Sequence, residues 1–175
     1  MNLERIRFKK SLKLVTLLLT SLLIASASAA TYYGMNISGT ITMKNAQLVW
    51  VAGTNANATI STSGYLATVG LSVMNGTNEI FNNTLYLKNE NSARIFTVNF
   101  TTTEALTTGF ATAEMFIYNN ASFSTLLGTL DLTRTTSPVT GLSLTGGEVY
   151  SLVFNITPTT TASASNTFGV EVTYK

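Results

Sequence analysis

Strict alternation of apolar and polar residues is the feature that most constrains this sequence. Over residues 35–43, the run Met-Asn-Ile-Ser-Gly-Thr-Ile-Thr-Met has an apolar residue or glycine at every odd position and a polar residue at every even position. Successive side chains of a β-strand point to opposite faces of the sheet, so the pattern predicts a strand with one buried face and one solvent-exposed face. Comparable segments recur to the end of the chain, which predicts an all-β fold.

Two of these segments have a distinctive character. The largely apolar run 46–52, which contains Trp50, predicts a strand buried on both faces. Residues 149–154 are strongly apolar and predict a central strand. The other expected strands are 65–74, 83–88, 94–100, 113–118, 129–133, 141–144 and 167–174. Residues 102–112 and 122–127 are expected to form short helices or irregular crossovers.

Turn-forming residues separate the strands. They occur at Gly53-Thr54-Asn55, Asn75-Gly76, Asn119-Asn120, Ser137-Pro138 and Gly146-Gly147. Many short strands at close spacing predict a two-sheet antiparallel sandwich of jelly-roll or immunoglobulin-like type. Aromatic side chains to fill its core are available at Trp50, Phe96, Phe116 and Phe154.

The N-terminus has the three parts of a secretory signal peptide. Residues 1–13 contain five basic residues and one acid, 14–24 are apolar, and 25–30 consist of Ala and Ser with A-x-A sites ending at Ala27 and Ala29. We expect residues 1–30 to be a Sec-type signal that is cleaved at or before the end of Ala30, and we expect the protein to be exported. A retained membrane helix needs about 20 apolar residues, more than this run has. A type IV pilin signal, cut before the apolar run, is a further alternative.

Composition excludes several kinds of chemistry. The 175-residue chain has no His and no Cys, so it has no disulfide framework, no zinc or haem ligand set of the usual kinds, and no Cys or Ser–His nucleophile. Cleavage after Ala30 removes five of the ten basic residues and one of the eight acidic residues, and the net charge changes from +2 to −2. The five remaining basic residues are scattered, so we do not expect a nucleic-acid partner.

The carboxylates give no sign of catalysis. No Asp-x-Asp run suggests a calcium loop, and no close pair suggests acid–base chemistry. Glu104 and Glu114 flank a Thr-rich stretch, but sequence alone does not bring them together. We therefore expect no enzyme activity, no cofactor, no metal and no small-molecule substrate.

Seven Asn-x-Ser/Thr sequons are candidate sites of N-glycosylation in an exported protein. They begin at Asn36, Asn57, Asn75, Asn82, Asn99, Asn120 and Asn155. A chain rich in Asn and Thr also forms such triplets by chance. Turn positions make Asn75 and Asn120 the better candidates, whereas Asn99 and Asn155 lie within expected strands.

The first strand allows two arrangements. It can pair within its own sandwich, or it can leave its subunit and fill a groove in a neighbour, which is donor-strand complementation. The apolar face that would enter the groove consists of Met35, Ile37, Gly39, Ile41 and Met43. Gly39, midway along that face, would let the backbone approach the groove closely. Pattern alone favours pairing within the subunit.

Several segments resemble the TasA/camelysin family of secreted β-sandwich proteins, and most closely the archaeal bundling pilins built on that fold. The similarity rests on the signal segment, the alternating strand after it, and the segments 83–89, 95–100, 153–158 and 168–174. It implies a jelly-roll pilin that polymerises by donating residues 31–43 to the next subunit and forms filaments that bundle in biofilms. Some members of the family have been called metalloproteases, an activity that a chain without His does not share.

These expectations define a structural filament subunit. Residues 1–30 would be the signal peptide, 31–43 the donor strand and 44–175 the β-sandwich pilin domain, with other copies of the chain as partners at the cell surface. A monomeric adhesion or carbohydrate-binding module is the main alternative. A type IV-like pilin and an enzyme using carboxylates or a Ser–Lys pair are the others.

Overall fold

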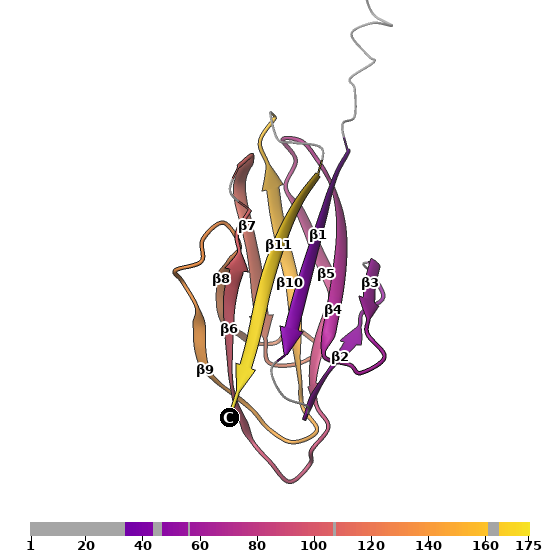
Figure 1. Ribbon diagram of the computed structural model, residues 1–175, viewed down its shortest axis with the longest axis vertical. Helices are drawn as coiled ribbons and strands as arrows, with labels where there is room; N and C mark the ends of the chain where they lie inside the picture. The colour runs from indigo at the N-terminus through magenta and orange to yellow at the C-terminus, as the bar shows by residue number, and fades with distance from the viewer. Residues whose placement is uncertain (1–33, 44–46, 56, 107, 161–164) are drawn as a thin grey trace, which may run out of the picture. The chain divides into compact units, whose positions relative to one another are not determined.

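The computed structural model describes residues 34–43, 47–55, 57–106, 108–160 and 165–175 (Figure 1). The described residues contain eleven β-strands and no helix, as the alternation predicts. Residues Tyr33–Lys175 form one compact unit. The expected signal peptide over 1–30, and the start of the expected donor segment at 31–33, lie outside the described residues.

The strands form two sheets packed as a sandwich. One sheet, sheet A, has six strands in the order β3-β4-β1-β11-β6-β9, and the other, sheet B, has five in the order β2-β5-β10-β7-β8. The strands are β1 (Gly34–Met43), β2 (Leu48–Ala52), β3 (Asn57–Ile60), β4 (Leu66–Met74), β5 (Glu79–Asn89), β6 (Phe96–Glu104), β7 (Phe110–Tyr118), β8 (Leu126–Asp131), β9 (Val139–Leu144), β10 (Val149–Pro158) and β11 (Ser165–Tyr174).

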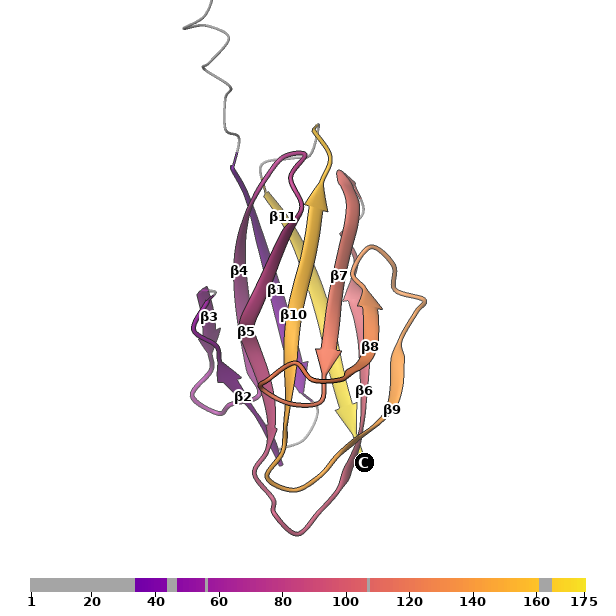
Figure 2. The same cartoon turned by 180° about the vertical axis from the view of Figure 1, so that it is seen from behind.

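A single apolar core fills the space between the sheets. The central strands supply its largest fully buried side chains, among them Tyr150 and Phe154 of β10, Phe100 of β6 and Phe168 of β11. Sheet A faces the viewer in Figure 1 and sheet B faces the viewer in Figure 2. As its apolar sequence predicts, β10 is the central strand of sheet B.

One strand pair departs from the antiparallel expectation. β1 and β11 run parallel, with Ile37 beside Asn166 and Ile41 beside Val170, and their arrowheads point the same way in Figure 1. Every other pairing is antiparallel. The first and last strands of the described chain are therefore neighbours, and sheet A is mixed.

Three local expectations need correction. β2 is an edge strand rather than a strand buried on both faces, and Val51 on it is 41% exposed. Phe116 faces outward from β7 and is only half-buried, because its neighbours Met115 and Ile117 take the core positions. Of the two forms expected for the segments 102–112 and 122–127, the irregular one is present, since their described residues contain strand ends and turns and no helix. The short strand β3 was not expected.

Candidate functional site

The candidate site is β1 together with the two strands that flank it. On one side, β1 pairs antiparallel with β4, from Gly34 opposite Met74 to Thr42 opposite Leu66. On the other side, it pairs parallel with β11 from Asn36 to Met43. The first strand of the described chain therefore occupies an interior position of sheet A, where both of its edges are hydrogen-bonded. We call the space that β1 occupies between β4 and β11 the strand groove.

The two faces of β1 have the character that its alternation predicts. Ile37 and Ile41 are completely buried, and Met43 is 9% exposed. Met35 pairs with Val73 of β4, and its side chain lies outside the described part of the structure. The residues on the opposite face are exposed and uncharged: Asn36, Ser38, Thr40 and Thr42. One face therefore seals the core, and the other forms the middle of the outer surface of sheet A.

Gly39 lies at the centre of the buried face, directly beside Phe168 of β11. A Cβ atom placed on Gly39 would overlap the Cζ and both Cε atoms of Phe168. The aromatic ring therefore fills the space that a side chain at position 39 would take. The ring is 1% exposed and contacts Phe154 of sheet B, with 5.7 Å between the ring centroids.

Polar contacts fasten the outer surface around β1. Ser72 of β4 donates a hydrogen bond from Oγ to Oδ1 of Asn36 across 2.9 Å. On the far side, Thr167 of β11 donates from Oγ1 to Oε1 of Glu104 across 2.8 Å. The first of these hydrogen bonds joins β1 to β4, and the second joins β11 to β6, so only the first bears directly on the pairing of β1.

The carboxylates that flank the Thr-rich stretch are not brought together. Glu104 belongs to β6 of sheet A, and Glu114 belongs to β7 of sheet B, where it accepts a hydrogen bond of 3.2 Å from Nδ2 of Asn155. Among the described residues, no group of three or more acidic side chains is arranged to hold a metal ion. The geometry around these carboxylates therefore adds nothing in favour of a catalytic pair.

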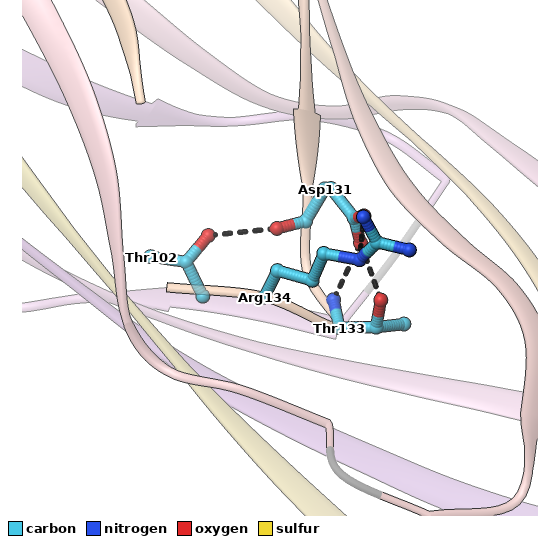
Figure 3. Close-up of polar contacts among 4 residues, drawn as sticks. All are labelled: Thr102, Asp131, Thr133 and Arg134. Carbon is cyan, nitrogen blue, oxygen red and sulfur yellow. Dashed lines mark hydrogen bonds and ion pairs between the residues drawn. The ribbon is translucent and has the colours of Figure 1, made fainter. Parts of the chain in front are cut away.

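Asp131, at the end of β8, connects the two sheets (Figure 3). Its backbone carbonyl accepts a hydrogen bond of 3.0 Å from Oγ1 of Thr102, a buried residue of β6. Its Oδ1 accepts hydrogen bonds from the backbone N–H and the hydroxyl of Thr133 at 2.8 and 2.6 Å, and its Oδ2 lies 3.5 Å from Nε of Arg134. Since each acceptor is satisfied within the chain, this cluster has a structural role.

Two buried polar atoms lack partners among the described residues: Nε1 of Trp50 and the hydroxyl of Tyr150. Burial raises the pKa of Tyr150 far above its usual value of 10.0, and the negative charge of Glu148 raises it further. The phenol therefore stays protonated and serves as a core side chain. Tyr174, by contrast, accepts a 2.6 Å hydrogen bond from the backbone N–H of Gln47 at its hydroxyl.

The structure distinguishes the seven sequons by exposure. Asn82 is exposed and makes no side-chain hydrogen bond within the described chain. Asn36 is exposed on β1, whereas Asn75, Asn99, Asn120 and Asn155 are only half-exposed. Asn99, Asn120 and Asn155 also use their amides in hydrogen bonds, and the side chain of Asn57 lies outside the described part. Asn82 is thus the most accessible of the described acceptors, although its position did not single it out in the sequence.

The sequence predicts strand β1 but not the walls of its groove. The walls come from β4 and β11, and only three-dimensional pairing shows that these distant segments flank β1. The sequence contained one clue to Phe168, since a glycine on the apolar face of a strand indicates a bulky neighbour that needs its space.

Comparison with known proteins does not identify a family. No protein-family model matches the chain, and no curated protein matches it. Within the described residues, no helix has the length and hydropathy needed to cross a membrane. The residues and geometry of the strand groove are therefore the features from which a function can be inferred.

Proposed function

We propose that the protein is a structural subunit of an extracellular filament, a bundling pilus, in which each subunit inserts its N-terminal strand into the strand groove of the next. In this assembly β1 would occupy the same position between β4 and β11 as it does here, but in a neighbouring copy. The single observation that carries the proposal is the interior position of a terminal strand, whose removal would expose two unpaired edges and the core.

The chemistry of β1 supports a transferable strand. Its buried face is apolar, its outer face is uncharged, and its backbone pairs on both edges. A free strand carries all of these features with it, so a neighbour's groove can recognise the strand through main-chain pairing and side-chain pockets together. Head-to-tail exchange of this kind generates an open fibre rather than a closed dimer.

Strand exchange replaces contacts within one chain by the same contacts between two chains. The strand contacts alone therefore do not favour the filament, and protein concentration and the new contacts between subunits must do so. The rate of exchange is a separate matter, because withdrawing a strand that is paired on both edges is slow. Assembly is accordingly fastest if β1 meets a neighbour's groove before it enters its own.

The remaining features fit inert extracellular material. The residues after the expected signal peptide carry few charges and neither His nor Cys. Low net charge limits repulsion between copies and so favours lateral association of filaments in bundles or biofilms. Consecutive strands cross repeatedly between the two sheets, as from β4 to β5 and from β5 to β6, which supports a sandwich of jelly-roll type.

One observation favours a second candidate function. In the single chain, the strand groove is already occupied by the chain's own β1. A stable closed monomer of this form would suit a cell-surface adhesion or carbohydrate-binding module. Such a protein would remain monomeric, and β1 would resist proteolysis in the monomer.

Ile41→Asp, compared with Ser38→Asp, tests the filament proposal. Ile41 is completely buried, and a carboxylate there would cost about 3–5 kcal/mol because no partner compensates it. Ser38 is on the exposed face of the same strand, so the control adds the same charge in solvent. We expect Ser38→Asp to form filaments in electron micrographs and Ile41→Asp to form none.

Mixing the variant with the unaltered chain separates a defect of the donor strand from general misfolding. The Ile41→Asp chain keeps every residue of β4 and β11, so it can accept a strand but cannot pass one on. Small amounts should therefore shorten the filaments of the unaltered protein. Normal filaments from Ile41→Asp alone, or filaments of unchanged length in the mixture, would contradict the proposal.

A further inference from the structure

The contact between Gly39 and Phe168 limits where β1 can lie in the strand groove. Gly39 is the only residue among positions 36–43 without a Cβ atom, and it is paired with Phe168 in the observed register. The terminal ring atoms of Phe168 occupy the volume next to the Gly39 backbone. Any other residue from 35 to 43 placed there would bring a Cβ atom into the ring.

Alternative registers meet a specific obstacle in each case. A shift of one residue turns the apolar side chains of β1 outward and brings Ser38 or Thr40 beside Phe168. A shift of two residues keeps the faces correct but brings Ile37 or Ile41 to the ring. The apolar face alone would accept such a shift, because it repeats every two residues. The glycine therefore distinguishes the correct register from its nearest competitors.

We infer that Gly39 and Phe168 together set the register of β1 and that Phe168 selects the strand which the groove accepts. The occupant that fits is a β-strand with glycine at its centre and apolar residues two positions away on each side. Residues 37–41 of another copy of this chain have that form. The selection of a neighbour's strand rests on the proposed function, whereas the control of register holds wherever the strand comes from.

A double-mutant cycle tests the contact itself. Leu at position 168 keeps the side-chain atoms as far as Cδ and lacks the Cε and Cζ atoms that a Cβ atom at position 39 would meet. Gly39→Ala should therefore lower the thermal unfolding midpoint in the Phe168 background much more than in the Phe168→Leu background. Equal losses in both backgrounds would overturn the inference, and Ser38→Ala on the exposed face is the control for altering β1.

Disulfide trapping tests the register directly, since the chain has no native cysteine. Thr40 and Thr68 are partners across β1 and β4, and both are exposed. Thr68→Cys is combined with Thr40→Cys for the observed register, or with Ser38→Cys or Thr42→Cys for shifts of two residues. Diagonal positions in an antiparallel pair lie about 7–8 Å apart between Cα atoms, too far for a disulfide. Only the Thr40 pair should oxidise fully with Phe168 present.

Phe168→Leu should allow the Ser38 or Thr42 pair to oxidise as well, because the obstacle to a two-residue shift is removed. Oxidation of the Thr40 pair alone in that background would overturn the inference. The products also separate this inference from the proposed function. Trapping confined to single chains in filaments would refute strand donation and leave the register result standing. Disulfides between chains, together with equal losses of the unfolding midpoint in the double-mutant cycle, would refute the register role alone.

Discussion

At the scale of single residues, Tyr150 is the buried group whose hydroxyl has no hydrogen-bond partner among the described residues. A buried hydroxyl without a partner has lost its bonds to water and gained none in return, so Tyr150→Phe should raise the free energy of unfolding by about 1 kcal/mol. Tyr174→Phe is the matched control, and it removes the acceptor of the Gln47 N–H, so it should lower stability by about 1 kcal/mol. Chemical denaturation of the purified variants measures both. A marked loss of stability in Tyr150→Phe would show that the hydroxyl has a partner after all.

The same residue predicts how stability depends on pH. Burial, together with the charge of Glu148, raises the pKa of Tyr150 above 10.0 in the folded protein. In alkaline solution the unfolded chain therefore loses this proton before the folded chain does. The preference of the folded state for the protonated phenol contributes fully to the free energy of unfolding below about pH 10, and this contribution is lost as pH rises further. Between pH 10 and pH 11, unfolding midpoints should fall more steeply for the unaltered chain than for Tyr150→Phe, and equal slopes would contradict this account.

At the scale of elements, local pattern predicted most strands and failed where the environment decides the outcome. The alternation of 35–43 and the apolar run at 149–154 are local signals, and β1 and β10 have the predicted character. The run 46–52 misled because apolar residues also occur on edge strands, where Val51 is exposed. Phe116 was wrongly expected in the core for a related reason. Side chains of a strand alternate between two faces, and on β7 the buried face carries Met115 and Ile117.

Local sequence pattern could not predict which strands form the strand groove. The parallel pairing of β1 with β11 joins segments that are far apart in sequence, and no periodicity in either segment specifies its partner. For the same reason, the part played by Phe168 could not be assigned. The residues of β1 itself were predictable, because alternation alone separates Ile37 and Ile41 from the polar residues between them.

The interior position of β1 predicts its resistance to hydrogen exchange. Both of its edges are paired, as are those of β10, whereas β3 and β9 lie at the edges of sheet A. Amides of β1 should therefore be protected nearly as well as those of β10 and far better than those of β3 and β9. Peptide-resolved exchange monitored by mass spectrometry measures this in the monomer or in the filament. Exchange of β1 as fast as that of β3 would show that the groove is not stably filled.

At the scale of the whole molecule, the order of strands along the chain places β1 at one end of the sandwich sequence and a wall of its groove at the other. β1 comes first in the sandwich, and β11, which forms one wall of its groove, comes last. If the chain is exported N-terminus first, as we propose, β1 emerges before its own groove exists. A neighbour that has already folded except for an empty groove could bind the strand in that interval, which would avoid the slow opening of a closed monomer.

Disulfide trapping within assembled filaments tests the central claim most directly. A chain with Thr40→Cys and Thr68→Cys places one thiol on β1 and the other on its partner strand β4. Intact filaments are oxidised and then denatured without reductant for gel electrophoresis. Strand donation predicts a ladder of covalent multimers that collapses to the monomer when reductant is added. Filaments that yield only monomers with an internal disulfide would contradict the account.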